Sequence, residues 1–334
     1  MSARASIIPV FVPHLGCPND CVFCNQRRIS GSLAPASPQD VTGAIERALR
    51  LPSPGSKRQL AFYGGSFTAI PDSEQEALLG AALPYLERGD IGSIRLSTRP
   101  DAIDGAVLAR LKRYGVETVE LGAQSMSDRV LALSGRGHTA QDVENASRAV
   151  KAAGFRLVLQ MMTGLPGSDD ESDVETARKI ASLGPDGVRV YPTVIVRDTV
   201  LYDLWKAGRY SEHTVEDAVR VCARIVPVFN AAGIPIIRMG LNPTEDLSGG
   251  DAAGGAYHPA LGELVRARIM RGRAEAVLEG AVPGSEITLR VNPRLMSQLV
   301  GQHGTNRTYL TEKFGLKSLK IVPDNAVETL TRVD

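Results

Sequence analysis

Short runs of apolar residues alternate along the first 240 residues with longer stretches in which apolar residues recur every three or four positions. Short apolar runs predict buried β-strands, and the longer period predicts amphipathic helices. Strands are expected at residues 7–12, 60–63, 93–97, 116–121, 157–161 and 187–191. Helices are expected near residues 38–50, 72–87, 102–114, 139–153, 169–183, 199–207 and 213–232.

This alternation also predicts the topology. A strand, a helix and a second strand form a parallel pair through a right-handed crossover. Several expected helices begin with a capping pair, such as Ser37 with Asp40 and Thr139 with Asp142. Six such repeats predict an α/β fold, a partial (β/α)6 TIM-like barrel that stays open because it lacks the usual eight strands.

The pattern changes after residue 240. Residues 241–255 are rich in glycine and polar residues, which is typical of a linker or a lid. We therefore expect three units: a barrel over residues 1–240, the glycine-rich linker or lid over 241–255, and a small α+β domain over 256–334.

Composition narrows the class of protein. The chain has 334 residues, of which 43% are hydrophobic, and a formal net charge of +1. A sizeable core is therefore possible, while bulk charge favours neither a nucleic-acid nor a membrane partner. The apolar run at residues 7–12 is too short for a signal peptide or a membrane span. Only four cysteines occur, which favours a reducing cytoplasm.

Three of these cysteines, Cys17, Cys21 and Cys24, lie within eight residues near the N-terminus. Three thiolates can hold a cubane iron–sulfur cluster and leave one iron open for a cofactor or substrate. His14 offers an alternative, because one histidine and three cysteines can also form a tetrahedral zinc site. The fourth cysteine, Cys222, falls on an apolar helical stripe and is expected in the core, so no second cluster is expected.

Polar residues and glycines follow the expected strands. In parallel α/β barrels the site lies at the carboxyl ends of the strands. Gly64 and Gly65 follow the second strand, where adjacent glycines allow the backbone to approach a ligand closely. Glu120 and Gln124 stand at the end of the fourth strand and are candidate site residues. Arg99 has two interpretations, a site residue or a structural partner of Asp101.

Taken in order, these motifs resemble one branch of the radical S-adenosylmethionine superfamily. The cysteine motif C-x3-C-x-aromatic-C is followed by Tyr-Gly-Gly-Ser-Phe-Thr, Thr-Arg-Pro-Asp, Glu-Leu-Gly-Ala-Gln-Ser, Arg-Gly-His-Thr and Met-Thr-Gly-Leu-Pro-Gly. The series is similar to the radical domain of the Elongator catalytic subunit and, more distantly, to oxygen-independent coproporphyrinogen oxidases. It covers roughly residues 5–240.

The resemblance implies two cofactors, a [4Fe-4S] cluster and S-adenosylmethionine. Cys17, Cys21 and Cys24 would bind the cluster. The residues implied at the S-adenosylmethionine site are Phe23, Gly64, Gly65, Thr98, Gln124 and Met162. The implied reaction also needs a reductant such as ferredoxin or flavodoxin. The Elongator subunit carries an acetyltransferase domain after its radical domain, and residues after 240 show no pattern for one, so acetyl transfer is not expected.

The C-terminal segment has a motif of its own. Residues 287–291 predict a strand, 293–300 a short helix, 305–314 a second helix and 316–322 a second strand, with the sequence Gly301-Gln302-His303-Gly304 between the helices. Residues 285–322 carry six Lys or Arg and two acids. This order resembles the core of a KH domain, whose GxxG loop clamps a nucleic-acid backbone. The resemblance implies RNA binding by residues 301–304 and Arg307. The alternative is a helical hairpin that only covers the barrel.

These observations predict a cytoplasmic radical enzyme. Reductive cleavage of S-adenosylmethionine at the cluster would give a 5′-deoxyadenosyl radical, and the expected substrate is an RNA nucleoside, foremost in tRNA. A radical enzyme acting on a small molecule such as a tetrapyrrole is the main alternative. A non-catalytic protein that binds a cluster or zinc is the third. No membrane partner is expected.

Overall fold

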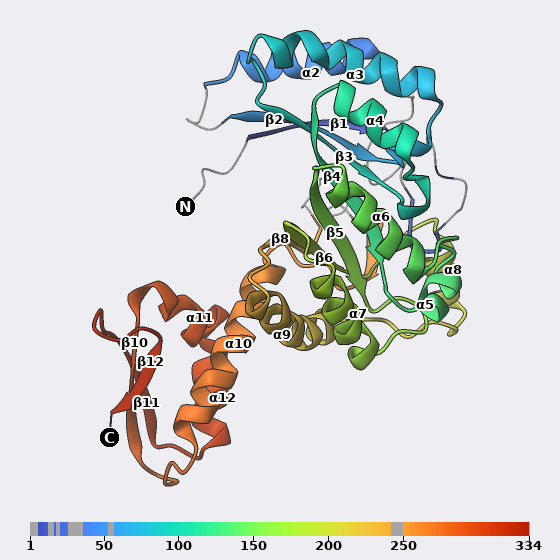
Figure 1. Ribbon diagram of the computed structural model, residues 1–334. Coiled ribbons are helices and arrows are strands. Elements are labelled where there is room, and N and C mark those ends of the chain that lie inside the picture. Colours follow the sequence, from blue (N-terminus) through green and yellow to red (C-terminus); the bar gives the residue numbers. More distant parts are fainter. Residues whose placement is uncertain are drawn as a thin grey trace.

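The computed structural model describes residues 6–12, 17, 21–25, 36–52, 57–241 and 250–333. Figure 1 shows a curved sheet with helices along its outer side and a smaller C-terminal lobe beside it. Helix α10 (Leu261–Leu278) leads from the barrel into the lobe. No helix in the described part of the chain combines the length and apolar character needed to cross a bilayer.

The barrel sheet contains seven parallel strands in the order β1-β2-β3-β4-β5-β6-β8. The strands are β1 (Ser6–Val12), β2 (Arg58–Gly64), β3 (Ser93–Thr98), β4 (Val116–Gln124), β5 (Arg156–Thr163), β6 (Gly187–Pro192) and β8 (Ile236–Met239). The expected α/β open barrel is confirmed. The expected number of six strands is wrong, because β8 adds a seventh next to β6. It was missed because it is only four residues long and includes an arginine.

The expected helices are present in order along the chain, and one short helix that was not expected, α5, lies between the fourth strand and α6. They are α2 (Pro38–Leu49), α3 (Asp72–Glu87), α4 (Gly105–Arg113), α5 (Asp128–Leu133), α6 (Ala140–Ala152), α7 (Asp170–Ser182), α8 (Val200–Lys206) and α9 (Val215–Ala231). Ser37 and Thr139 form the expected capping boxes with Asp40 and Asp142. These caps satisfy main-chain N–H groups at the helix starts and fix where each helix leaves the sheet.

The outer face of the sheet packs against the helices in one apolar core. Phe62, Leu96 and Val190 project from the strands into this core, and Ile225 and Cys222 reach it from α9. Cys222 is fully buried, as the apolar stripe predicted. Because this core fills the outer side of the sheet, the radical site is expected on the inner face or at the rim of the open barrel.

The C-terminal lobe has a core of its own, formed around Met270, Leu289 and Leu310. Its elements after α10 are β10 (Glu286–Val291), α11 (Met296–Val300), α12 (Thr305–Lys313), β11 (Ser318–Pro323) and β12 (Leu330–Val333), and the sheet order is β11-β10-β12. The expected strand–helix–loop–helix–strand order is present. Helix α10 and strand β12 extend it.

The glycine-rich segment expected as a linker or lid has a more specific structure at its end. Residues 242–249 lie outside the described part of the chain. Strand β9 (Ala252–Gly255) pairs antiparallel with β7 (Val194–Val196), which follows β6. This pairing ties the end of the segment to the barrel rim.

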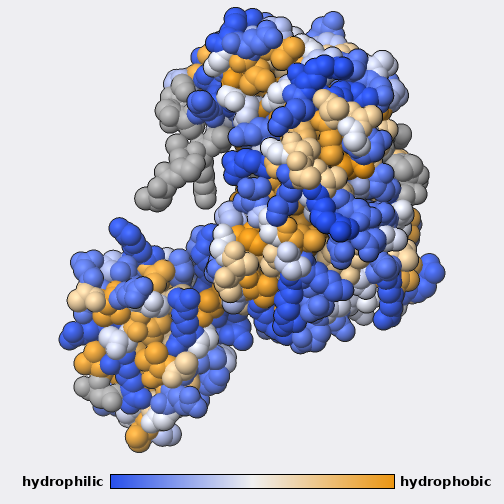
Figure 2. Space-filling view, viewed as in Figure 1, coloured by the Kyte–Doolittle hydropathy of each residue, from blue (hydrophilic) through white to orange (hydrophobic). Residues whose placement is uncertain are grey.

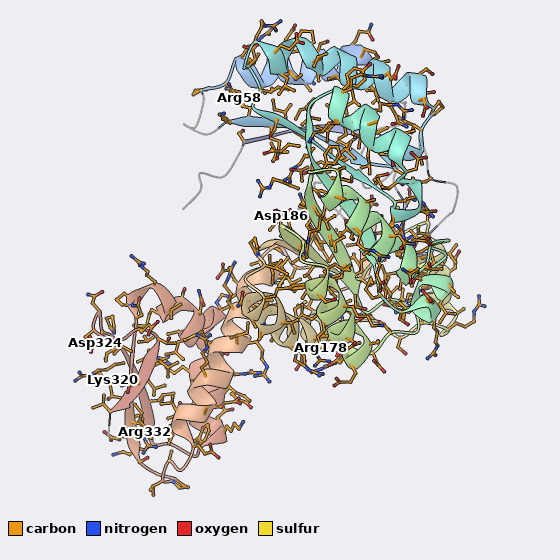
Figure 3. All side chains as sticks on the ribbon, viewed as in Figure 1. Arg58, Arg178, Asp186, Lys320, Asp324 and Arg332 are labelled. Atoms are coloured by element: carbon orange, nitrogen blue, oxygen red, sulfur yellow. The ribbon has the colours of Figure 1, made fainter. Side chains whose placement is uncertain are left out.

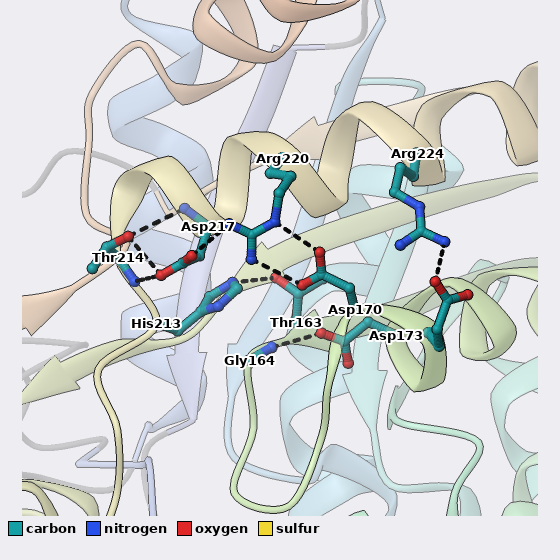
Figure 4. Close-up of polar contacts among 10 residues, drawn as sticks. Thr163, Gly164, Asp170, Asp173, His213, Thr214, Asp217, Arg220 and Arg224 are labelled. Carbon is teal, nitrogen blue, oxygen red and sulfur yellow. Dashed lines mark hydrogen bonds and ion pairs between the residues drawn. The ribbon is translucent and has the colours of Figure 1, made fainter.

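A buried polar network secures the rim after β5 (Figure 4). The carboxylate of Asp173, on α7, accepts a hydrogen bond from the main-chain N–H of Gly164 at 2.8 Å. The Nε2 atom of His213 lies 3.1 Å from the hydroxyl of Thr163, the last residue of β5. A side chain at position 164 would overlap the His213 ring, so Gly164 is required there. These contacts hold the β5–α7 turn against α7 and the start of α9.

Replacing Asp173 by asparagine tests this network. Burial raises the pKa of Asp173 well above the usual range of a carboxyl group, to about 7. A carboxyl whose pKa is raised by folding stabilises the fold at pH values below its unfolded pKa, and this contribution is lost as pH rises through the folded pKa. We expect the Tm of Asp173→Asn to fall less than that of the wild type between about pH 5 and pH 8. Scanning calorimetry at several pH values measures this difference.

Asp186→Asn is the matched control. Asp186 (labelled in Figure 3) is exposed and also accepts a main-chain hydrogen bond, from Leu157 at 2.8 Å near the start of β5. Its replacement should leave the pH dependence of the Tm unchanged. An Asp173→Asn protein with the same pH dependence as the wild type would contradict the assignment.

Candidate cluster and S-adenosylmethionine pocket

A pocket of about 200 Å³ lies at the carboxyl ends of strands β2 to β5. The cysteine loop forms one wall, and the turns after the strands form the others. The pocket gathers every residue implied at the cluster and S-adenosylmethionine sites except Met162: Cys17, Cys21, Phe23, Cys24, Gly64, Gly65, Thr98 and Gln124. Residues separated by more than 100 positions in the sequence therefore line one cavity.

Main-chain hydrogen bonds hold the described part of the cysteine loop. The N–H of Val22 donates to the carbonyl of Ser134, after α5, at 3.1 Å, and the N–H of Leu201, in α8, donates to the carbonyl of Val22 at 2.7 Å. The N–H of Cys24 donates to the carbonyl of Cys21 in a tight turn. Two helices therefore fix the backbone between Cys21 and Cys24.

The donor atoms suit an iron–sulfur cluster. All three cysteines are half-buried and line the pocket, and the thiol of Cys17 lies 3.9 Å from the hydroxyl of Ser66. Within the described ranges no three His, Cys, Asp or Glu side chains are close enough to hold a single metal ion. The three thiols therefore line the same pocket, but they do not lie close enough together to bind a single metal ion. Three sulfur donors fit a cluster with one open iron. His14, the fourth ligand in the zinc alternative, lies outside the described residues.

The two glycines after β2 bring main chain to the pocket wall. Gly64 has a φ of 106°, and a Cβ atom there would lie 3.3 Å from the backbone nitrogen of Val12. The N–H of Gly65 donates to the carbonyl of Val12 at 2.8 Å. A side chain at position 64 would be strained and crowded, so the close approach of this turn depends on glycine.

Gln124 is held in an unusual conformation at the end of β4. Its φ of 64° lies in the left-handed region, which a residue with a side chain rarely adopts. Gln160 donates a hydrogen bond to its side-chain oxygen at 3.0 Å. A Cβ atom on Gly122 would lie 2.8 Å from the Gln124 amide nitrogen. Backbone strain of this kind is typical of residues whose side chain must point into a ligand site.

The other residues implied at the S-adenosylmethionine site have different surroundings. Thr98 lines the pocket, but its hydroxyl lies 2.6 Å from that of Thr68 and so also secures the turn after β2. Phe23 and Met162 pack together in a small apolar cluster that includes Tyr191. This cluster places apolar side chains beside the cysteine loop.

Two buried arginines lie next to the thiols. Arg136 Nη1 lies 3.3 Å from the Cys21 sulfur, and Arg136 Nη2 donates to the carbonyl of Gly122 at 2.9 Å. Arg99 donates to the carbonyl of Arg136 at 2.8 Å and forms a two-point ion pair with Asp101. The expected pairing of Arg99 with Asp101 is therefore present, and Arg99 also supports Arg136 and lines the pocket, so both interpretations of Arg99 stay open. In the sequence, Arg136 was noted only as part of the Arg-Gly-His-Thr motif. Its contact with Cys21, 115 positions away, was not predicted.

His138 is neutral in this environment. Burial, followed by the nearby charge of Arg136, lowers the pKa of His138 to about 4. Its Nε2 lies 3.2 Å from the carbonyl of Ala123, which only accepts hydrogen bonds, so Nε2 carries the proton. His138 therefore supports the end of β4 and is uncharged near neutral pH.

A second charged network lies on the inner face of the barrel beside the pocket. Glu120 accepts hydrogen bonds from Arg95 at 2.8 Å and from Arg189 at 2.8 and 3.1 Å. Arg189 also donates to the hydroxyls of Tyr63 and Tyr191, at 3.1 and 3.2 Å. Burial, followed by the charge of Glu120, raises the pKa of Tyr63, so this phenol stays protonated. The sequence pointed to Glu120, but not to its two arginine partners.

The residues implied in RNA binding lie elsewhere, in the C-terminal lobe. Gly301 and Gly304 have φ values of 76° and 78°, and His303 has a φ of 52°. A Cβ atom on Gly301 would lie 2.8 Å from the hydroxyl of Thr305, so the first glycine is required by the loop. Gln302, His303 and Arg307 are exposed. The loop between α11 and α12 therefore presents main chain and polar side chains to solvent.

Comparison with known proteins gives two family matches. The model of the radical SAM superfamily matches residues 11–180, about half of the chain, and that of the radical SAM C-terminal domain matches residues 185–271. Human Elongator complex protein 3 is 34% identical over 203 residues, which cover 54% of this chain and 37% of that protein. The tRNA uridine(34) acetyltransferase of Methanocaldococcus jannaschii is 26% identical over 258 residues, covering 65% of this chain and 47% of the relative. The chain thus spans less than half the length of these relatives.

Solved structures show the same fold. Elp3 of Methanocaldococcus infernus superposes with a TM-score of 0.64 at 23% identity and covers 82% of this chain and 64% of its own. Coproporphyrinogen III oxidase (HemN) of Escherichia coli superposes with a TM-score of 0.50 at 18% identity, over 70% of this chain and 54% of its own.

Cysteine replacement tests the cluster ligands. We expect Cys21→Ala to lose nearly all acid-labile sulfide and iron after anaerobic reconstitution, because only two thiolates would remain. Cys222→Ala is the control: the same substitution in the core should leave the iron and sulfide content unchanged. One bound zinc and no sulfide in the wild type would contradict the cluster assignment.

Arg136→Gln tests the contact with the Cys21 sulfur. Hydrogen bonds to the sulfurs and nearby positive charge favour the reduced cluster, so the variant should have a lower midpoint potential. We expect a shift of about 60 mV, equal to a tenfold change in a one-electron equilibrium. A redox titration followed by electron paramagnetic resonance measures it. Arg129→Gln, an exposed change on α5, should leave the potential unchanged. Equal potentials in the wild type and Arg136→Gln would refute the assignment.

Proposed function

Because the chain belongs to the radical S-adenosylmethionine superfamily, we propose that it modifies a nucleoside of tRNA. As a member of this superfamily it is an enzyme that uses a [4Fe-4S] cluster and S-adenosylmethionine. Together these groups supply a 5′-deoxyadenosyl radical. In the proposed reaction, one electron, one S-adenosylmethionine and one substrate C–H group give methionine, 5′-deoxyadenosine and a substrate radical. The electron would come from a donor such as ferredoxin or flavodoxin.

One observation carries the proposal of a tRNA substrate. The barrel is similar in sequence to proteins named for a reaction on tRNA uridine 34, and the matches cover 65% and 62% of this chain. A uridine of tRNA is therefore the first substrate to test. The proposal concerns hydrogen abstraction and includes no acyl transfer.

The chain's own residues would hold the cofactors at the rim. Cys17, Cys21 and Cys24 would bind three irons, and the backbone at Gly64 and Gly65 would contact the amino group of the methionine moiety. Of the further S-adenosylmethionine contacts, Phe23 and Met162 would form the apolar surface against the adenine, and Thr98 and Gln124 the polar contacts. The support for these roles is that all but Met162 line one pocket, and Met162 packs on Phe23.

The inner network would position the substrate beside this pocket. Glu120 lies between Arg95 and Arg189, so the inner face carries two positive charges and one negative charge. Arg189 fixes the hydroxyls of Tyr63 and Tyr191 by donating a hydrogen bond to each. Such a surface suits a nucleotide, which combines a negative phosphate with hydrogen-bonding groups on its base.

The loop of residues 301–304 with Arg307 would bind the RNA outside the barrel. In the described structure it lies on the lobe and not in the cluster pocket. RNA bound there would be held by contacts independent of the radical site. Binding and chemistry should therefore be separable by mutation.

The experiment is anaerobic. The protein is reconstituted with iron and sulfide, reduced with dithionite, and assayed for 5′-deoxyadenosine with and without bulk bacterial tRNA. We expect tRNA to stimulate release of 5′-deoxyadenosine several-fold. The variant Gln302→Asp with His303→Asp places two negative charges on the exposed loop without changing its glycines. It should lose most of the stimulation and keep the release measured without RNA.

Gln141→Asp, on the exposed surface of α6, is the control and should behave as the wild type. Stimulation by a tetrapyrrole and not by tRNA would reject the RNA substrate in favour of a small molecule. An intact cluster with no release of 5′-deoxyadenosine under any condition would contradict the proposed reaction. If tRNA stimulates the loop variant as strongly as the wild type, the loop has no role in RNA binding.

A further inference from the structure

A cleft of about 570 Å³ separates the barrel from the C-terminal lobe. The barrel wall comes from the end of α9 and from β8, and the wall of the lobe comes from α10 and α11. Figure 2 shows the surface hollowed where the lobe stands away from the barrel. The polar side chains that matter here are Asn230, Arg238, Arg266, Arg273 and Gln298.

The floor of the cleft is the outer edge of the barrel sheet. Strand β8 pairs with β6 on one side only, and all four of its residues line the cleft. Ile237 is 43% exposed there. Val226 and Ile269 add apolar surface from the helices on either side. The cleft thus combines apolar side chains with the main-chain edge of a strand.

The charge of the cleft is positive. Its charged side chains are Arg238, Arg266, Arg273 and Glu263. Glu263 pairs with Arg266. Arg238 donates to the carbonyls of residues 240 and 241, and no carboxylate pairs with it among the described residues. Among the described residues, the contact found for Arg273 is a weak one to the sulfur of Met270 at 3.9 Å. Two positive charges are therefore available to a ligand.

We propose that this cleft holds the sugar–phosphate backbone of an unpaired RNA segment. The inference rests on the proposed function. Arginines on both walls suit phosphates, the apolar floor suits ribose and base faces, and the amides of Asn230 and Gln298 suit base edges. A peptide added to the edge of β8 would use the floor but would give the arginines on α10 no defined partner. A cleft of this volume is too small for a duplex.

The cleft also connects the two sites proposed for RNA. Arg238 is the register partner of Arg189, which belongs to the network on the inner face of the barrel. Gln298, on α11, lies three residues before Gly301 and the GxxG loop, and its carbonyl accepts a hydrogen bond from the buried Asn306 of α12. An RNA strand lying in the cleft would run from the GxxG loop of the lobe to the open side of the barrel.

The double variant Arg238→Gln with Arg273→Gln tests the cleft, because these two arginines have no carboxylate partner among the described residues. Binding of bulk tRNA to the reconstituted full-length protein is measured by fluorescence anisotropy over a range of salt concentrations. Loss of two contacts to single-stranded phosphates should reduce the slope of log K against log salt by about 1.4. We expect an affinity about tenfold lower near 0.1 M salt. Release of 5′-deoxyadenosine without RNA should not change, since neither residue lies in the radical pocket.

Arg178→Gln is the matched control. Arg178, labelled on α7 in Figure 3, pairs with Glu175 three residues earlier and is 55% exposed, so its replacement removes an arginine charge outside the cleft. It should leave both the affinity and the slope unchanged. Wild-type affinity and slope in the cleft variant would overturn the inference while leaving tRNA as substrate. A wild-type protein that binds no tRNA would overturn both.

Discussion

The parallel pairing of seven neighbouring strands is the constraint on which the site depends. All seven carboxyl ends meet along one rim, so the turns after β2, β3, β4 and β5 line a single pocket. The cysteine loop joins this rim because Val22 exchanges main-chain hydrogen bonds with Ser134 and Leu201. If either hydrogen bond were lost, the backbone between Cys21 and Cys24 would be held less firmly at the rim, and the thiols would be less well placed in the pocket.

Local patterns predicted most of the fold. The capping pairs at Ser37 and Thr139 lie at the starts of α2 and α6, because a cap depends only on residues three positions apart. Strand β8 was not predicted, because its short sequence becomes a strand only through pairing with β6. Helix α10 was also missed. Its apolar residues face both the barrel and the lobe, which weakens the helical period.

The sequence predicted the cysteines and glycines of the site, but it did not predict which side chains contact one another there. The spacing of the three cysteines and the glycines after β2 carries chemical information in the sequence itself. The contact of Arg136 with Cys21 joins residues 115 positions apart, and that of Arg189 with Glu120 joins residues 69 positions apart. Such pairs depend on which strands and turns become neighbours, and a single sequence does not record this.

The buried charges near the pocket indicate what is still to be bound there. Arg95, Arg99, Arg136 and Arg189 are all largely buried, and the described structure pairs Arg99 with Asp101 and both Arg95 and Arg189 with Glu120. Arg99 Nη1 is buried with no hydrogen-bond partner among the described residues. Unbalanced buried cations are costly unless a negative group approaches them. Thiolates at Cys17 and Cys21 would place negative charge near Arg99 and Arg136. S-adenosylmethionine carries an ammonium and a sulfonium group as well as a carboxylate, so it would add no net negative charge. The buried arginines would therefore be balanced locally, by a thiolate or by that carboxylate, and not by the net charge of the cofactors.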